Sequence, residues 1–429
     1  MAAASLRVAM ITTFYPPLSF GGDAQYVRRL AHALAARGVE VEIIFDGDAW
    51  RVLSGAIAGA ALPEPAGVTV HRLQSLWPLG STLLTHQLGR PVVQARKLRE
   101  ILAKGFDVIH YHNVSLVGGP GIMSFGDALK FYTPHDHWLV CPTHVLWRHN
   151  RELCTGRECL KCNFAYRRPP QLWRATRYLE QQSANVDVFI ALSRSVAENH
   201  SRFGFSREMM LMSPFVGPST AREPFPRRTA QRPYFLFVGR LEALKGLQEL
   251  ILEFDPALPA DLWIAGTGTF EPELRRVAAD RPQIRFLGHV PETKLVALYR
   301  EALAVVAPSL GYEVFPSVVL EAFREGTPVV VRELGPYPQI IEESGGGLLF
   351  RDPNELRAAL ARLAGDGALR ARLGASGQRT VETRWSEDTA VAAYLELIRR
   401  TAKSRSRPDI SAKVDALPGV AKADATRAQ

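Results

Sequence analysis

The sequence predicts an α/β protein made of two domains, each with a parallel sheet. Short apolar runs of the kind that form buried strands alternate with segments of helical apolar spacing along most of the chain. The alternation begins with an apolar run at residues 6–13. It begins again at residue 234, after a segment rich in Pro and Arg that indicates a linker. A chain of 429 residues is long enough to bury a core in each of two such domains.

Positive charge is concentrated in the first half of the chain. The formal net charge is +9; residues 1–217 contain 23 Lys and Arg against 16 Asp and Glu, whereas residues 218–400 contain 23 against 24. Such a surplus often reflects solubility alone; the other interpretation is a partner that is an anionic membrane surface or an anionic acceptor. No recognised nucleic-acid motif occurs, so we do not expect a nucleic-acid partner.

The sequence shows no sign of a membrane-spanning or secreted protein. No apolar segment reaches the roughly 20 residues that a spanning helix needs. The N-terminus also lacks a basic region followed by an apolar core. We therefore expect a cytoplasmic protein, and peripheral association with the inner face of the membrane is left open.

The first strand leads into a loop with two adjacent glycines. Gly21 and Gly22 lie between the strand at residues 6–13 and a predicted helix at residues 24–38, and a second strand follows at residues 39–45. Glycine lets a backbone approach a bound molecule closely because it has no Cβ. No G-x-G-x-x-G motif follows the strand, so a dinucleotide site is not predicted. The pair indicates either a contact with a reacting molecule or only a tight turn.

Two later strands of the first half end in histidine. The strand at residues 106–112 carries His110 and His112, and the next strand runs into His135 and Asp136. Imidazole has a pKa near neutrality and can donate to a sugar hydroxyl or to a developing charge. Because most histidines in such clusters have a structural role, we expect only one of the three to contact a bound molecule. Asp136 would orient a ring or an acceptor hydroxyl.

All four cysteines lie in one short segment, residues 141–162. They are Cys141, Cys154, Cys159 and Cys162. Disulfides are not expected in a cytoplasmic protein, and the last two cysteines have metal-like Cys-x2-Cys spacing. Four thiolates would form a closed structural zinc site, with an iron–sulfur cluster as the second choice. Free thiols or a redox pair remain the alternatives.

The second half opens with a strand that runs into Gly239 and Arg240, and Lys245 follows at the start of a helix. A guanidinium and an ammonium at the end of a strand are suited to binding a diphosphate. A later strand ends in a turn with Gly266 and Gly268. By itself this Gly-x-Gly turn is a weak nucleotide signal, and no acidic residue follows at the distance a dinucleotide site requires.

Residues 311–331 contain a loop, a short helix and the start of a strand. Pro316 precedes a predicted helix at residues 317–325, which begins where a parallel strand ends. The bare N–H groups of such a helix start suit a phosphate. Glu313 in the loop would accept hydrogen bonds from a hexose, and Glu321 on the helix would accept them from a ribose. Two solvated surface acids are the alternative.

These segments resemble the family 4 retaining glycosyltransferases, which have the GT-B fold. The resemblance covers roughly residues 6–400 and rests mainly on Gly-Arg-x4-Lys-Gly at residues 239–246 and on residues 311–331, with Glu-x-Phe-Pro and Glu-Ala-Phe-Arg-Glu-Gly-Thr-Pro-Val-Val. Many relatives have Gly where this chain has Pro316. Some members also share His-Asp-x-Trp-Leu-Val-Cys-Pro followed by a Cys-rich loop, so this loop would be an insertion beside the acceptor.

The resemblance implies a metal-independent hexosyltransferase that retains anomeric configuration. Its donor site would consist of residues from both signatures and the Gly-x-Gly turn: Gly239, Arg240, Lys245, Gly266, Gly268, Glu313, Phe315, Pro316, Ser317 and Glu321. The catalytic residues would be His135, Arg240, Lys245 and Glu313. Gly21, Gly22 and Asp136 would lie on the acceptor side. The donor would be a nucleotide diphosphate sugar, and the acceptor a glycan or a lipid-linked molecule in polysaccharide or glycolipid assembly.

The implied organisation has four parts. An N-terminal acceptor-side domain would cover residues 1–216, and a nucleotide-sugar-binding domain residues 217–384. A crossover helix would return to the first domain over residues 385–402, and residues 403–429 would be disordered. Two other functions remain open: a sugar-nucleotide epimerase, and a binding protein of this fold without transferase turnover. A phosphorylase would need a pyridoxal-phosphate lysine, which the motifs do not support.

Overall fold

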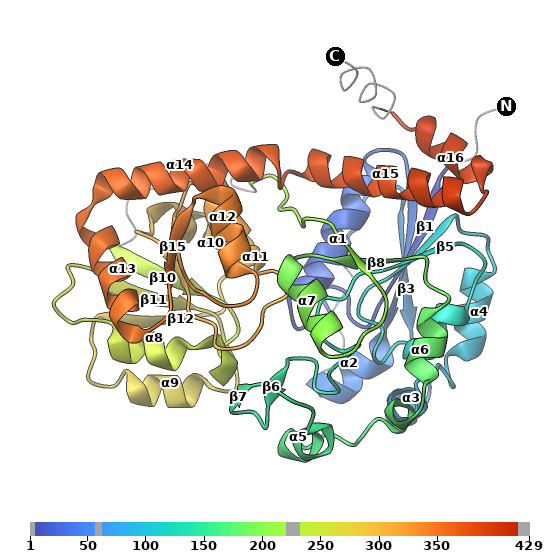
Figure 1. Cartoon of the computed structure of the whole chain (residues 1–429), viewed down its shortest axis with the longest axis horizontal. Coiled ribbons are helices and arrows are strands. Elements are labelled where there is room, and N and C mark those ends of the chain that lie inside the picture. The colour runs from blue at the N-terminus through green and yellow to red at the C-terminus, as the bar shows by residue number, and fades with distance from the viewer. Residues whose placement is uncertain (1–4, 56–61, 220–231, 419–429) are drawn as a thin grey trace.

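The computed structural model describes residues 5–55, 62–219 and 232–418 of the chain. Figure 1 shows two halves side by side, each with a sheet between layers of helices. A helical segment near the C-terminus runs along one side of both halves. This arrangement confirms the predicted fold class of two Rossmann-like domains. The predicted linker lies mostly at residues 220–231, outside the described residues.

In the N-terminal domain, the described strands form a parallel sheet in the order β3-β2-β1-β4-β5-β8-β9. The strands are β1 (Arg7–Thr12), β2 (Glu40–Asp46), β3 (Val68–Leu73), β4 (Val108–Tyr111), β5 (Leu129–Tyr132), β8 (Val188–Ala191) and β9 (Met209–Leu211). The order reverses between β1 and β4. Open α/β sheets bind ligands at such a point, beyond the carboxyl ends of the strands.

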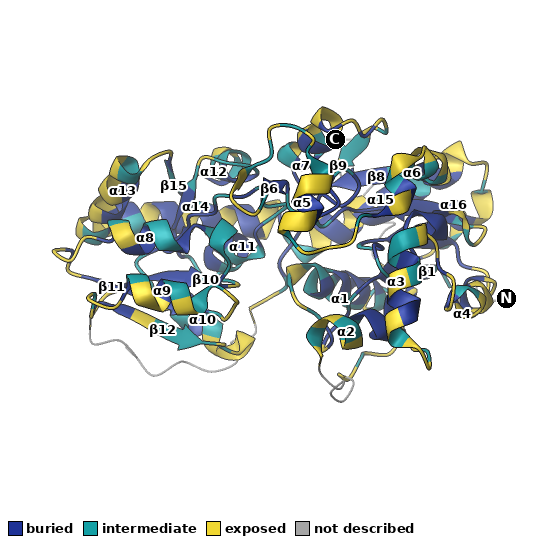
Figure 2. Cartoon of the chain, turned by 90° about the horizontal axis from the view of Figure 1, so that it is seen from below, coloured by how far each residue is buried: buried dark blue, intermediate teal, exposed yellow. Residues whose placement is uncertain are grey.

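Helices cover both faces of this sheet, so the central strands are buried on both sides and are almost wholly apolar. The helices of this domain are α1 (Gly22–Ala35), α2 (Gly47–Ser54), α3 (Pro78–Leu88), α4 (Ala95–Leu102), η1 (Pro120–Ser124), η2 (Leu172–Ala175), α6 (Tyr178–Ser183) and α7 (Arg194–Arg202). Figure 2 shows the strands mostly dark blue, whereas the outer faces of the helices are yellow.

In the C-terminal domain, the described strands are also parallel, in the order β12-β11-β10-β13-β14-β15. They are β10 (Tyr234–Val238), β11 (Asp261–Ala265), β12 (Ile284–Gly288), β13 (Val305–Ala307), β14 (Val329–Arg332) and β15 (Gly347–Phe350). The helices are η3 (Ala243–Lys245), α8 (Leu247–Glu253), α9 (Glu271–Val277), α10 (Glu292–Glu301), α11 (Ser317–Arg324), α12 (Tyr337–Ser344) and α13 (Pro353–Gly365). Here the order reverses between β10 and β13.

The C-terminal helices connect the two domains. After α14 (Gly367–Thr383), Ser386 caps α15 (Glu387–Ser404) by accepting a hydrogen bond from the Thr389 N–H. Tyr394 on α15 is buried, and its hydroxyl lies 3.1 Å from His110 Nδ1. The helix therefore packs back on the N-terminal domain, as the predicted fold requires.

Residues 403–418 are not the irregular tail that we expected. Helix α15 continues to Ser404, and α16 (Pro408–Asp415) follows with Ile410 and Val414 buried in the N-terminal core. The segment is mostly polar, so its few apolar residues did not indicate a helix. They stabilise a helix only because the surface of the N-terminal domain lies beside them and buries them. Residues 419–429, the remainder of the predicted tail, lie outside the described residues.

The cysteine-containing segment forms a small lobe, here called the cysteine lobe (residues 141–168). It contains the short strands β6 (Trp147–Arg148) and β7 (Glu152–Leu153), which pair antiparallel, and the helix α5 (Cys159–Ala165). Figure 1 shows it at the lower edge of the molecule. Its own apolar core is small.

The loops at the carboxyl ends of β10 and β11 pack directly against each other through glycine. A Cβ on Gly266, whose φ is +142°, would lie 1.9 Å from the Gly239 carbonyl oxygen. A Cβ on Gly268 would lie 2.3 Å from the Leu241 oxygen. The Gly-x-Gly turn therefore supports the loop that carries Arg240.

We expect Gly266→Ala to lower the free energy of unfolding by about 3 kcal/mol, because the methyl group forces two backbones apart in a strained conformation. Gly365→Ala is the control, since nothing lies within 4 Å of its Cβ position. Chemical denaturation of both variants measures the difference. Equal stability of the two variants would contradict the tight packing of these loops.

Candidate functional site

The loops after β10 and β13 bring two of the predicted donor residues into direct contact. Lys245 Nζ donates to Glu313 Oε1 at 2.7 Å, and Ser309 Oγ donates to the same oxygen at 2.7 Å. Burial alone would raise the pKa of Glu313, but the Lys245 charge and these hydrogen bonds lower it below its ordinary value. Glu313 is therefore ionised at neutral pH and held in one orientation.

Arg240 lies at the same place but is more exposed. About half of its side chain is open to solvent, and Nη1 contacts Glu242 Oε1 at 2.7 Å. Its charge also contributes to the lowered pKa of Glu313. Both predicted cations thus lie around this carboxylate, and Arg240 is free enough to turn toward a bound anion.

Helix α11 begins beside this group. Pro316 is its N-terminal cap residue, and Phe315 contacts Trp385 edge to face. The Cβ position of Gly22 lies 3.7 Å from Ser317 Oγ, so the Gly21–Gly22 loop of the N-terminal domain faces the start of α11 across the domains. A larger side chain at residue 22 would fill this space.

Glu321 lies farther along α11, where it is held from two sides. Tyr299 donates from its hydroxyl to Glu321 Oε2 at 3.0 Å. From the N-terminal domain, Arg29 Nη2 donates to Glu321 Oε1 at 3.2 Å and also to Glu292 Oε1 at 3.2 Å. One carboxylate oxygen of the predicted ribose site is therefore occupied by a cation from the opposite domain.

The three predicted histidines are connected, and only His135 is partly exposed. His110 and His112 are buried, and burial lowers the pKa of His110 to about 3. His112 Nδ1 and His135 Nε2 share a hydrogen bond of 2.9 Å. His135 is half-buried beside Tyr26 on α1. Because α1 begins at the paired glycines, His135 lies near that loop.

Burial lowers the pKa of His135, while the carboxylates of Asp23 and Asp136 act in the opposite direction. The ring is therefore neutral at pH 7 and can donate one N–H. Asp136 accepts hydrogen bonds from the Trp138 N–H at 2.8 Å and from His144 Nδ1 at 2.8 Å. Both hydrogen bonds lie within the loop after β5, so the Asp136 carboxylate stabilises the conformation of that loop.

The four cysteines are free thiols that line one small cavity in the cysteine lobe. Burial raises the pKa of Cys154, and the other three thiols raise it further. Within the described residues, however, no three His, Cys, Asp or Glu side chains are arranged to hold a metal ion. The predicted zinc site is therefore not supported. The lobe does contact the candidate site, because Tyr312, the neighbour of Glu313, packs against its small core.

Sequence reasoning missed the residues that position the two acids. None of these residues belongs to a recognised motif. Arg29 and Tyr299 are distant in the sequence from Glu321, which they contact. Ser309 is close to Glu313 in the sequence, but a serine after a strand is too common to be a signal. Asp23 is different, because it directly follows the paired glycines and accepts a 2.6 Å hydrogen bond from Asn113 Nδ2. Its place beside that loop was a signal that could have been used.

Across the described part of the chain, none of the helices combines the length and the apolar character needed to cross a membrane.

Two family models and several known proteins match the chain. Residues 20–219 match the family described as Glycosyltransferase Family 4, and residues 232–366 match Glycosyl transferases group 1. The chain is 28% identical over 446 residues to a glycogen synthase of Mycobacterium tuberculosis, covering 96% of this chain and 100% of that protein. It is 29% identical over 433 residues to a D-inositol 3-phosphate glycosyltransferase of Xylanimonas cellulosilytica, covering 93% and 98%.

Solved structures show the same fold. A sucrose-phosphate synthase from Thermosynechococcus elongatus superposes with a TM-score of 0.68 at 20% identity, covering 93% of this chain and 100% of the other. HepE of Anabaena, solved in complex with UDP and glucose, gives a TM-score of 0.64 at 17% identity, covering 92% and 99%. The two matched families together span most of the chain, and the chain therefore belongs to the family 4 glycosyltransferases of the GT-B fold.

Proposed function

We propose that this glycosyltransferase moves a hexose-type sugar from a nucleotide diphosphate sugar to a hydroxyl group, with retained anomeric configuration and without a catalytic metal ion. The observation that carries the proposal is the grouping of Lys245, Arg240 and Glu313 beside the start of α11. Two cations and a helix start form a site for a diphosphate, and a fixed carboxylate beside them can hold a sugar.

Each residue has a distinct role in the proposal. Lys245 keeps two further N–H donors for phosphate while it contacts Glu313, and Arg240 turns from Glu242 to the diphosphate. Charge builds up on the leaving diphosphate as the glycosidic bond breaks, and these cations stabilise it. Glu313 accepts hydrogen bonds from the hexose, and Glu321 accepts them from the ribose.

His135 is neutral in this proposal and supports the electron-poor sugar from the side of the N-terminal domain. The acceptor hydroxyl enters beside Gly21 and Gly22, where the missing Cβ atoms leave room. A phosphate oxygen of the donor takes the acceptor proton on the same face of the sugar, which retains the anomeric configuration. The names of the relatives support a glycan or a glycolipid precursor as acceptor.

Incubation with UDP- and GDP-sugars, followed by proton NMR of the product, tests this function. We expect transfer or slow hydrolysis of one donor class, a product with the anomeric configuration of the donor, and no loss of rate in EDTA. Inversion would contradict the retaining mechanism. Binding of the nucleotide without any turnover would favour a binding protein, and conversion of the donor to an isomer would favour an epimerase.

Arg29 competes with the ribose for Glu321 in this proposal. We expect Arg29→Ala to bind UDP or GDP about threefold more tightly, because it frees an oxygen held by a partly exposed ion pair. Isothermal titration calorimetry measures the change. The control is Arg194→Ala, which removes another ion pair between the domains, to Glu342. An equal gain in both variants would mean that domain opening, not competition at Glu321, causes the effect.

A further inference from the structure

An unusual apolar surface covers the lower end of the N-terminal domain. Seven of the large apolar side chains that are exposed among the described residues lie between residues 76 and 93. Leu76 is fully exposed, and Trp77 and Leu79 are each 62% exposed. Monomeric proteins rarely leave a contiguous apolar surface of this kind in water unless it contacts a partner.

Helix α3 within this surface is oriented opposite to an ordinary surface helix. The side that packs inward carries Gly80, Ser81, Thr82 and Thr85, all buried. Leucines remain on the outer side: Leu79, Leu83 and Leu88. A surface helix normally buries its large apolar residues and exposes its polar ones. The helix is nevertheless well anchored, because Pro78 starts it and Gly89 ends it in the left-handed conformation.

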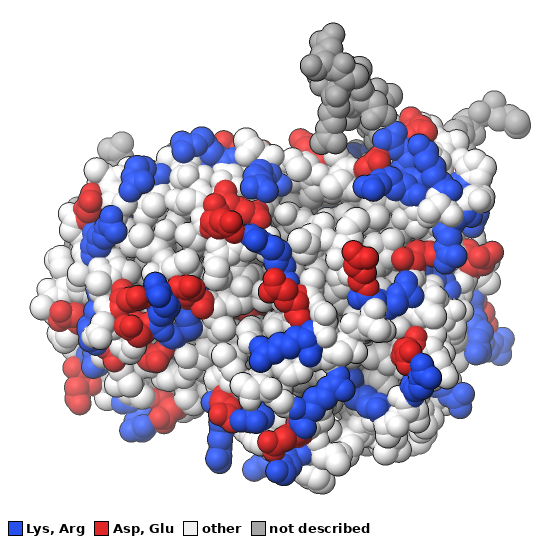
Figure 3. All heavy atoms as spheres, in the orientation of Figure 1, with Lys and Arg blue, Asp and Glu red and all other residues white. Residues whose placement is uncertain are grey.

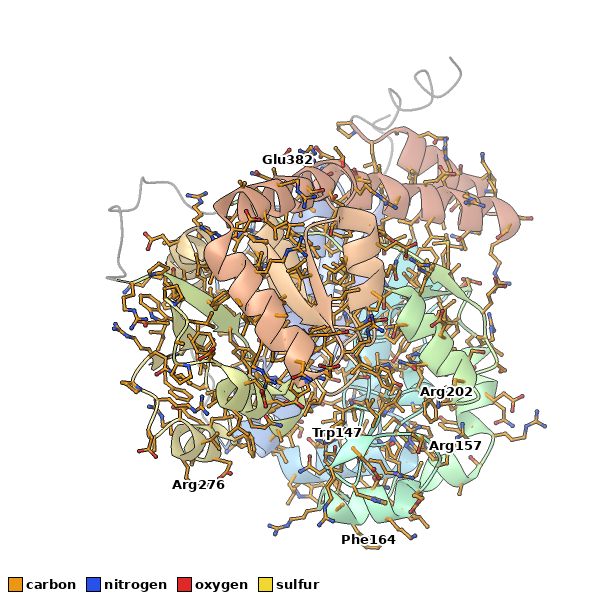
Figure 4. The ribbon with its side chains drawn as sticks, turned by 60° about the vertical axis from the view of Figure 1, so that its left-hand side comes forward. Trp147, Arg157, Phe164, Arg202, Arg276 and Glu382 are labelled. Carbon is orange, nitrogen blue, oxygen red and sulfur yellow. The ribbon has the colours of Figure 1, made fainter. Side chains whose placement is uncertain are left out.

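The surface continues onto η2, and exposed apolar side chains also occur on α5. Helix η2 contacts α3, and Trp173 Nε1 donates to the His86 carbonyl oxygen at 3.1 Å. Leu172 on η2 is 62% exposed, and Phe164 on α5 is 74% exposed. Figure 4 shows Phe164 at the lower tip of the molecule, and Figure 2 shows α3 and α5 on the side that faces the viewer from below. We call these exposed residues of 76–93, α5 and η2 the apolar face.

Basic side chains outnumber acidic ones beside the apolar face. Residues 76–99 contain Arg90, Arg96, Lys97 and Arg99, all exposed, and no Asp or Glu; Glu100 follows and pairs with Arg96 at 2.7 Å. The cysteine lobe adds the exposed cations Arg151, Lys161 and Arg167, of which Lys161 pairs with Glu158 at 3.0 Å. Figure 3 shows more blue than red along the lower edge of this domain. Apolar side chains beside a surplus of cations match the interface of a bilayer that contains anionic lipid.

We propose that the apolar face docks this protein on an anionic lipid bilayer. Leucine and tryptophan side chains around α3 enter the boundary between headgroups and acyl chains, and the arginines and lysines contact anionic headgroups. The cysteine lobe joins this face to the candidate site, because its core packs on Tyr312 beside Glu313. The proposal rests on the proposed function in one respect: an acceptor anchored in the same bilayer would then reach the site.

Co-sedimentation of the full chain with lipid vesicles tests the proposal. We expect binding to vesicles that mix phosphatidylcholine and phosphatidylglycerol in equal amounts, and at least about tenfold weaker binding to pure phosphatidylcholine. Leu76→Ser with Leu79→Ser should weaken binding to the mixed vesicles by roughly a hundredfold, because the bilayer then no longer buries two leucine side chains. Arg96→Gln with Lys97→Gln should weaken it by about tenfold at low salt.

Leu211→Ser with Leu252→Ser is the matched control, since these leucines are 50% and 54% exposed and lie outside the apolar face. Equal loss of vesicle binding in this control would overturn the proposal, as would failure of the parent chain to bind mixed vesicles. A dimer in solution that the Leu76/Leu79 variant abolishes would also overturn it, in favour of a second copy as the occupant. UDP and GDP binding, measured without lipid, tests the donor site separately and should be the same in all these variants.

Discussion

Arg240→Ala is expected to lower kcat for sugar transfer by about a thousandfold, near the upper end of what one transition-state donor contributes. Arg240 would stabilise charge that appears on the diphosphate only as the glycosidic bond breaks, so kcat falls more than donor affinity. Its side chain is half exposed and pairs with the neighbouring Glu242. Loss of such a surface pair costs at most about 1 kcal/mol of stability.

Steady-state kinetics and thermal unfolding of the same preparation separate these effects. The control is Arg276→Ala, which removes a guanidinium of the same domain that is paired with Glu273 on α9. Figure 4 shows Arg276 at the outer edge of the C-terminal domain. A kcat near the parent value in Arg240→Ala would exclude this residue from the charge stabilisation. A large fall in Tm would indicate a structural role instead.

Glu313→Gln is expected to lower kcat by a few hundredfold and also to destabilise the fold. The amide is a weaker acceptor than a carboxylate for the hydroxyls of the sugar. It also leaves Lys245, whose side chain is mostly buried, without its counter-charge, which costs about 2 kcal/mol at neutral pH. Transfer kinetics and chemical denaturation measure the two losses independently.

The pH dependence of this stability loss gives a second readout. The folded-state pKa of Glu313 lies below its ordinary value of 4.5, so the folded state favours the ionised carboxylate. The resulting stabilisation is complete above pH 4.5 and disappears as the pH falls through the lowered pKa. The stability difference between parent and Glu313→Gln should therefore shrink below pH 4.5. Glu355→Gln, at a partly exposed position on α13, provides the control, and a difference that stays constant with pH would contradict the ion pair.

Much of the candidate site could be predicted because its residues lie at fixed positions relative to local elements. Lys245 directly precedes α8, and Glu313 lies between β13 and α11. The carboxyl ends of neighbouring parallel strands meet at one edge of a sheet, so the elements themselves bring these two side chains together. The crossover helix that the resemblance implied for residues 385–402 corresponds to α15, which follows its cap residue Ser386.

Other features depend on segments that are distant in the sequence. Arg29 contacts Glu321 only because the two domains face each other. Helix α16 forms only because Ile410 is buried in the N-terminal core. From the sequence alone, the leucines of α3 would be predicted to lie in the core. Only the packing of the helix shows that several of them are exposed.

The sequence by itself determined the two-domain α/β fold and which cations and acids make up the candidate site, because strand and helix periodicity and short motifs act over a few residues. The tertiary structure alone decided which domain supplies a partner to Glu321, which histidine lies beside the glycine loop and which side of α3 meets solvent. These outcomes depend on how distant surfaces pack, and no pattern within one segment encodes that packing.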